Sequence, residues 1–78
     1  MILLKHEVWQ QEGGETMLCF AGELGDIARQ TLEPNAKLIN TFYASSHYEA
    51  MTIYYKFMDW GEYTTKFEAD KQPYKFQQ

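Results

Sequence analysis

Cysteine and proline are scarce in this sequence, which has one Cys and two Pro among 78 residues. Because Cys19 is alone, no disulfide within the chain can support the fold. A lone thiol without a disulfide framework is typical of proteins from reducing compartments. We therefore expect the protein to reside in the cytoplasm, and its stability to be marginal unless a metal, a cofactor or a second copy of the chain contributes.

Basic residues are also few, with seven Lys and Arg against eleven Asp and Glu and a net charge of −4. Binding to a nucleic-acid backbone requires clustered cations, so the charge argues against a nucleic-acid partner. No apolar run is long enough to span a bilayer, and the segment MILLKHEVWQ becomes charged too early for a signal peptide. We accordingly expect no membrane association.

The motifs of common enzymes and metal sites are absent as well. Gly13, Gly14, Gly22 and Gly25 fit neither the dinucleotide nor the nucleoside-triphosphate loop spacing. His47 and the residue two positions later cannot share a helix face, which excludes a metal site there. We expect no cofactor, no metal and no catalytic residues, and interpret the chain as a non-enzyme.

The length of the chain allows one domain, which we place at residues 1–72, followed by an irregular tail at 73–78. A domain this small buries only about 60% of its unfolded surface. Small domains often gain stability from a second copy of the same chain. This argument makes a homo-oligomer, or a complex with another protein, the favoured state.

Strict alternation of side chains over residues 2–9 predicts a strand, and residues 15–21 predict its hairpin partner. Gly13-Gly14 suits the tight turn between them. That turn would place Val8 opposite Cys19 and His6 opposite Ala21, and a bulge would exchange the two faces. In this register one face carries Trp9, Leu18 and Phe20, which form either a partner surface or a surface covered by the C-terminal segment.

The rest of the chain reads as helix, strand and helix. Apolar spacing predicts a helix over 23–33, capped at Gly22 or Asp26 and stopped by Pro34. Residues 37–44 alternate as a third strand, and Ser46 with Glu49 forms a capping box for a helix to about residue 58. Gly61 is the expected end signal, and residues 63–67 could add a short edge strand.

This order predicts the α+β class: a small antiparallel sheet of about three strands in the order 2-1-3, with two helices packed on one face. A sheet covered on one side leaves its other face to solvent or to a partner.

The second helix is unusually rich in aromatic residues. Its expected core side carries His47, Ala50, Met51, Tyr54, Phe57 and Met58. Tyr48 and Tyr55 fall on the opposite side, where they are either ordinary solvated tyrosines or anchors for a partner. The first hypothesis is therefore an interaction module that uses Trp9, Leu18, Phe20, Tyr48 and Tyr55.

A second hypothesis is a small-molecule or catalytic pocket lined by aromatic rings. It would be formed by His47, Tyr54, Trp60 and Tyr63, with His6 or Cys19 supplying polar chemistry. A lone Cys is more often a small buried hydrophobe, and a His at a helix start more often makes a local hydrogen bond.

The segment HYEAMTIYYKFMDWGEYTT, preceded by TFYAS, resembles a group of short bacterial proteins without a known activity. The likeness runs from about Gly25 to Tyr74. It implies a bacterial source and a stand-alone domain, and it transfers no residue role to this chain.

Overall fold

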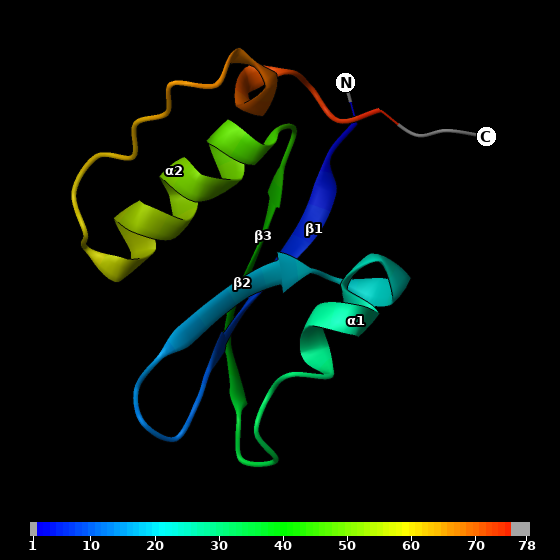
Figure 1. Cartoon of the computed structure of the whole chain (residues 1–78), viewed down its shortest axis with the longest axis vertical. Helices are drawn as coiled ribbons and strands as arrows, with labels where there is room; N and C mark the ends of the chain where they lie inside the picture. Colours follow the sequence, from blue (N-terminus) through cyan, green and yellow to red (C-terminus); the bar gives the residue numbers. More distant parts are fainter. Residues whose placement is uncertain (1, 76–78) are drawn as a thin grey trace. The chain divides into compact units, whose positions relative to one another are not determined.

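The computed structural model describes residues 2–75 and has the predicted α+β class (Figure 1). Its sheet contains three strands in the order β2-β1-β3, and two α-helices, α1 and α2, accompany it. Both the strand order and the number of helices confirm the prediction. The chain divides into two compact units, one of residues 5–42 and the other of residues 2–4 with 43–75. The single domain over 1–72 stays a prediction.

The N-terminal hairpin joins β1 (Leu4–Gln10) to β2 (Thr16–Phe20). At its turn the Gly14 N–H donates to the Gln11 carbonyl over 2.9 Å, and the Gln11 N–H donates to the Glu15 carbonyl over 2.7 Å. Gly14 has a φ of 92°, which favours glycine, whereas Gly13 has ordinary φ. The hairpin loop therefore contains three residues and ends in a bulge glycine.

This three-residue loop shifts the strand pairing by one position from the predicted register. Val8 lies opposite Leu18 rather than Cys19, and His6 lies opposite Phe20 rather than Ala21. The predicted register was wrong because only Gly14 takes a positive φ, so the two glycines do not form a two-residue turn.

The shift separates the predicted apolar patch. Leu18 and Phe20 now share a face with His6 and Val8, while Trp9 lies on the opposite face beside Met17. The prediction that Trp9, Leu18 and Phe20 form one surface is therefore wrong.

The helical segment after β2 is much shorter than predicted. A 3₁₀ turn, η1 (Gly22–Gly25), leads into α1 (Asp26–Arg29), and neither start has a side-chain cap. Ile27, expected in the buried stripe, is 81% exposed. A single helical turn gains little from its own hydrogen bonds, so contacts with β2 determine its position.

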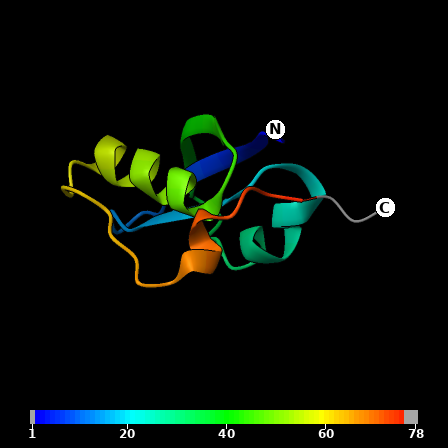
Figure 2. The same ribbon diagram turned by 90° about the horizontal axis from the view of Figure 1, so that it is seen from above.

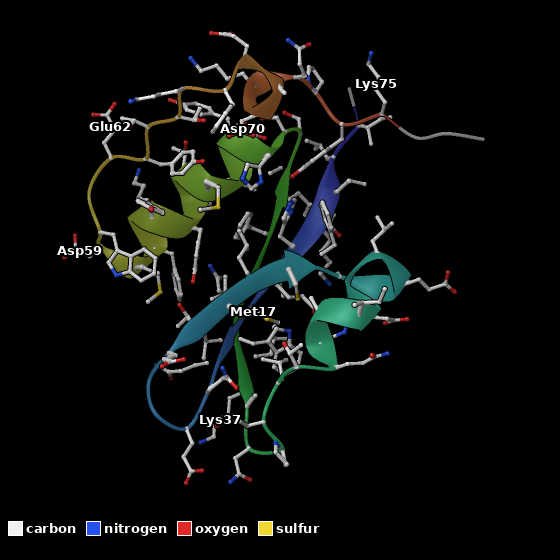
Figure 3. The ribbon with its side chains drawn as sticks, in the orientation of Figure 1. Met17, Lys37, Asp59, Glu62, Asp70 and Lys75 are labelled. Atoms are coloured by element: carbon white, nitrogen blue, oxygen red, sulfur yellow. The ribbon has the colours of Figure 1, made fainter. Side chains whose placement is uncertain are left out.

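Two residues, Thr31 and Arg29, fix this segment against the hairpin. Thr31 Oγ1 lies 3.8 Å from Sδ of Met17. Met17, labelled in Figure 3, is the cross-strand partner of Trp9 and shares its face. Arg29 Nη1 donates to the Phe20 carbonyl over 2.8 Å and to Glu7 Oε1 over 3.0 Å. Trp9 Nε1 donates to the same Glu7 oxygen over 3.0 Å. Arg29 therefore links α1 to both strands of the hairpin.

The third strand, β3 (Lys37–Ala44), and the second helix, α2 (His47–Met58), match their predicted bounds closely. The segment after α2 differs from its prediction. Within residues 2–75 no strand forms at 63–67; instead the Thr65 hydroxyl accepts from the Phe67 N–H and donates to Asp70 Oδ2 over 2.7 Å. These local bonds replace a strand ladder and lead into the 3₁₀ turn η2 (Glu68–Lys71).

The chain then returns to the start of α2. The Tyr74 N–H donates to the Ser45 carbonyl over 2.7 Å, and Pro73 forms a bridge with Ser46. As a result η2 lies alongside the first turns of α2 (Figures 1 and 2). Of the predicted tail, residues 76–78 lie outside the described residues.

Candidate functional site: the aromatic cluster

The start of α2 is fixed by the predicted capping residues. Ser46 Oγ accepts from the Glu49 N–H over 3.0 Å. The Glu49 carboxylate reaches back to Ser45, accepting from its N–H over 2.6 Å and from its hydroxyl over 3.0 Å. The capping box is therefore present, except that the Glu49 carboxylate accepts from Ser45, one residue before the usual donor, the N–H of the N-cap Ser46.

The end of α2 is formed by an aspartate instead of the expected Gly61. Asp59 adopts the left-handed conformation, with φ 59° and ψ 42°. Its N–H donates to the Lys56 carbonyl, and the Trp60 N–H donates to the Tyr55 carbonyl over 3.0 Å. This is the Schellman arrangement, which turns the chain back and brings the residue after the turn against the last helical turns.

This turn brings together five rings, which we call the aromatic cluster: Tyr48, Tyr54, Tyr55, Trp60 and Tyr63. The Trp60 ring centroid lies 5.2 Å from that of Tyr54 and 5.3 Å from that of Tyr55, both edge-to-face. Tyr63 lies 5.1 Å from Tyr55 and 5.9 Å from Tyr48. Such pairs gain about 0.5–1.5 kcal/mol each beyond the area they bury.

The aromatic cluster partly covers Tyr48 and Tyr55, whose exposure the sequence did not determine. Tyr54 is buried, and Tyr48 and Tyr55 are half-buried beneath the rings that follow α2. The Lys71 ammonium adds a cation–π contact 5.4 Å from the Tyr48 ring centroid. The chain therefore provides its own partner for the side of α2 that was predicted to bind another protein.

Two rings at the end of α2 remain accessible, which we call the Phe57–Trp60 surface. Phe57 is 45% exposed and Trp60 is 52% exposed. Phe57 was assigned to the core side of the helix, and that assignment is wrong. The side chains of Asp59 and Glu62 point outward from the segment that follows α2 (Figure 3). Apolar rings with charged neighbours are typical of contact surfaces.

The predicted histidine and cysteine chemistry is not assembled. His6 is buried between rings of its own unit, parallel to Phe42 at 5.2 Å and tilted against Phe20 at 4.9 Å. Cys19 lies opposite Glu7, on the other face of the hairpin. His47 is exposed at the start of α2. In unit 5–42, therefore, the register separates the thiol from the imidazole that was its candidate base.

Burial raises the pKa of the Cys19 thiol, and the negative charge of Glu7 raises it further, while Arg29 acts in the opposite direction. The thiolate is the reactive form, so its population at neutral pH falls. We expect native Cys19 to react with iodoacetamide about tenfold or more slowly than the urea-unfolded chain, because reaction requires local opening. Mass spectrometry of timed samples measures both rates. Equal rates would contradict a buried, protonated thiol.

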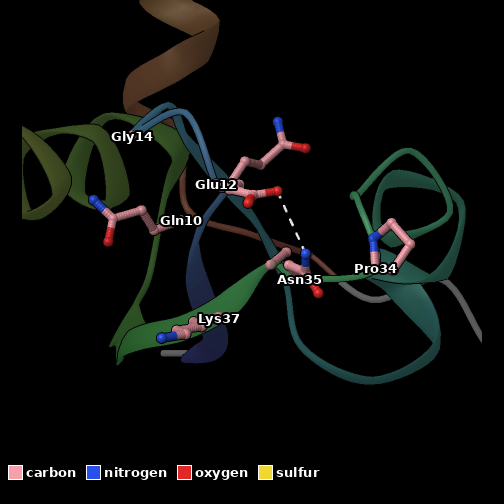
Figure 4. A pocket seen from close by; sticks show the side chains of 8 residues that line it. Gln10, Glu12, Gly14, Pro34, Asn35 and Lys37 are labelled. Atoms are coloured by element: carbon pink, nitrogen blue, oxygen red, sulfur yellow. Dashed lines mark hydrogen bonds between the residues drawn. The ribbon is translucent and has the colours of Figure 1, made fainter.

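A polar pocket lies elsewhere, between the hairpin turn and the segment before β3 (Figure 4). Its volume is about 640 Å³. Asn35 Nδ2 donates to Glu12 Oε2 across it over 3.4 Å. The lining residues are Gln10, Gln11, Glu12, Gly14, Pro34, Asn35, Ala36 and Lys37. None of the residues proposed for the aromatic pocket belongs to it.

Within residues 2–75 no group of three His, Cys, Asp or Glu side chains is arranged to hold a metal ion. No helix in that range has the length and apolarity needed to cross a bilayer. No protein-family model, curated protein or solved structure matches the chain. The site is therefore interpreted from its geometry.

Sequence reasoning missed the Phe57–Trp60 surface because it assigned Phe57 to the core side of the helix and expected Gly61, not Asp59, to provide the turn that ends it. Asp59 belongs to the few residue types that tolerate the left-handed conformation, so the signal was present but weaker than that of a glycine. The left-handed turn at Asp59 directs Trp60 back toward Tyr55 and leaves its side chain 52% exposed.

Proposed function

We propose that this protein is a small interaction module that binds a protein chain through its exposed aromatic surface. The occupant is a second copy or another protein. The observation that carries the proposal is the exposure of Phe57 and Trp60 at the end of α2. Tryptophan is among the residues that most often dominate binding energy at interfaces.

The aromatic cluster supports this role by holding the exposed ring in place. Trp60 packs edge-to-face on Tyr54 and Tyr55, and its backbone is fixed by the helix-ending hydrogen bond. A ring that is already ordered loses little conformational entropy when a partner covers it. The Phe57–Trp60 surface therefore offers apolar area at a reduced entropic cost.

The same geometry favours a protein surface over a small-molecule pocket. A ligand cage requires rings that surround free space, whereas these rings contact one another at 5.1–5.3 Å between centroids. The outward acidic side chains of Asp59 and Glu62 would add selectivity at the rim of a protein contact. We further propose that the protein acts in the cytoplasm of a bacterium. The lone Cys favours the cytoplasm, and the resemblance to short bacterial proteins favours the source.

Photo-cross-linking tests the surface directly. With p-benzoylphenylalanine replacing Trp60, we expect irradiation of producing cells to give one discrete cross-linked product. The matched control carries the same residue at Phe67, which is 71% exposed in the same unit but outside the cluster. A product of twice the chain mass identifies self-association, and another mass identifies a different protein.

With the partner in hand, Trp60→Ser is expected to raise Kd about tenfold or more, the effect of losing an aromatic anchor. Phe67→Ser should leave Kd within about twofold. Equal cross-linking from both positions, or none from Trp60, would remove the proposal.

A further inference from the structure

A different surface of the chain, the outer edge of β3, carries a more specific inference. In the strand order β2-β1-β3 both β2 and β3 lie at edges. Edge strands present unpaired backbone groups, and proteins usually protect them with charges, prolines, short length or a covering segment. β3 has eight residues, no proline, and one charged residue, Lys37, at its first position.

The β2 edge has such protection. The Ala21 N–H donates to the Lys5 carbonyl at one end of the hairpin, and the Gln11 N–H donates to the Glu15 carbonyl at the other. Between these two ends, the residue pairs of β1 and β2 alternate between hydrogen-bonded and non-hydrogen-bonded pairs. Phe20 falls in a non-bonded pair, so its carbonyl points away from β1. Arg29 donates to that outward carbonyl over 2.8 Å. The last residue of β2 is therefore closed to another strand.

No comparable hydrogen bond protects β3 in the part of the chain that the structure describes. Among residues 2–75, no backbone hydrogen bond outside the sheet and no side-chain hydrogen bond reaches residues 37–44. The backbone groups that face away from β1 are available to a further strand. Tyr43 is 59% exposed, and Leu38 and Ile39 are also exposed. The strand therefore combines an open edge with uncovered apolar side chains.

We propose that β3 pairs antiparallel with β3 of a second copy around a two-fold axis that passes through Thr41. The product is a continuous six-stranded sheet. This contact is independent of the Phe57–Trp60 surface and goes beyond the function proposed from it. Cross-strand partners share a face, so a symmetric pairing requires residue numbers of equal parity opposite each other.

With Thr41 opposite its own copy, Ile39 lies opposite Tyr43 of the second copy, and the same pair repeats across the axis. A β-branched residue beside an aromatic ring is a favourable cross-strand pair. Moving the axis to Asn40 would instead place Lys37 opposite Tyr43 and leave Ile39 without the ring. The exposed side chains therefore select the Thr41 register.

Charge also favours a second copy as the occupant. β3 contains one cation and no acidic residue. A charged partner peptide would therefore find no row of opposite charges along this strand. In the Thr41 register the two Lys37 side chains lie at opposite ends of the paired strands, which avoids repulsion between them. The strand is thus complementary to itself.

Sedimentation equilibrium tests the pairing with matched variants. We expect the parent chain to associate to twice its 9.2 kDa mass with increasing concentration. Thr41→Lys places two like charges on the axis and should weaken the dimer about tenfold or more. Thr64→Lys, the same change at an exposed loop position, should leave it unchanged. Circular dichroism confirms that each variant is folded.

Disulfide trapping provides a second measurement that does not depend on a disruptive charge. In a Cys19→Ala background, Thr41→Cys places two thiols directly opposite each other, with Cα atoms about 4.5–5.5 Å apart, within disulfide range. We expect a covalent dimer on mild oxidation, and none from Thr64→Cys at the same concentration.

Three outcomes overturn the inference: a parent chain that stays monomeric to millimolar concentration, a dimer that Thr41→Lys leaves intact, or equal trapping at both cysteine positions. A dimer lost with Trp60→Ser but retained with Thr41→Lys would assign self-association to the Phe57–Trp60 surface. That result would overturn the strand pairing and support the proposed function.

Discussion

Replacing Gly25 with alanine is expected to be among the most destabilising single substitutions in unit 5–42. A Cβ at this position would lie 1.8 Å from the Phe20 carbonyl oxygen and 2.7 Å from Arg29 Nη1. Backbone atoms cannot yield by that distance without moving η1 away from β2. The movement would also break the hydrogen bond from Arg29 to Phe20.

Gly25 is required here because there is no room for a Cβ atom, and its backbone conformation does not itself require glycine. Its φ of −103° and ψ of 3° are accessible to any residue, and the residue is buried. Overpacking costs about 1–3 kcal/mol and occasionally more, and a Cβ 1.8 Å from a backbone oxygen places this substitution at the upper end. In a chain whose total stability is on the order of 5 kcal/mol, urea denaturation should show a much lower midpoint or no cooperative transition.

Gly13→Ala is the matched control for this substitution. Gly13 has no atom within 4 Å of an added Cβ and no positive φ. A methyl group there should change the free energy of unfolding by about 1 kcal/mol or less. Similar midpoints for the two variants would contradict the close approach of η1 to β2.

Truncation of Tyr54 to alanine is the second substitution with a large expected effect. Tyr54 is buried and contacts Tyr55 and Trp60 through their ring edges. Removing a buried aromatic ring costs about 3–5 kcal/mol, from lost burial and the cavity left behind. The midpoint temperature of thermal unfolding should therefore fall. The fluorescence of Trp60 should change below that midpoint, because its ring has lost the contact with Tyr54.

Phe67→Ala is the corresponding control, because that ring is largely in solvent and belongs to the same unit. We expect its free energy of unfolding to stay within about 0.5 kcal/mol of the parent. An equally large loss from Phe67→Ala, or a small one from Tyr54→Ala, would mean that Tyr54 does not anchor the cluster.

The Tyr54 result bears on the interaction surface. The Tyr54 ring supports the indole that we propose as the binding anchor, so Tyr54→Ala should weaken partner binding even under conditions where the chain remains folded. Gly25 belongs to the other unit, residues 5–42.

The helical segment after β2 shows why periodicity misled. Leu24, Ile27 and Leu32 fit one helical stripe, yet α1 ends after a single turn and Ile27 is in solvent. The contacts that determine this segment are the Gly25 approach to β2 and the Arg29 bonds to Glu7 and the Phe20 carbonyl. No local pattern encodes such long-range contacts.

The aromatic stretch shows the same limit for the candidate site. Tyr48 and Tyr55 fall on the side of α2 away from its buried residues, as the helical spacing predicted. Their covering by Trp60 and Tyr63 depends on where the chain turns, which is set by the left-handed conformation of Asp59. The residues were identified in advance, but their exposure was not.

By itself the sequence determined the α+β class, the strand order, the bounds of β3 and the capped start of α2. The strands and the helix start follow from side-chain alternation and from capping groups within a few residues of one another, and the strand order from the simplest antiparallel connection of three strands. The hairpin register and the exposure of the aromatic rings depend on long-range packing, which no local pattern contains. The positive φ of Gly14 sets the hairpin register, because it fixes which residues of β2 face β1. The positive φ of Asp59 sets the exposure of the rings, because it turns Trp60 and Tyr63 back onto α2.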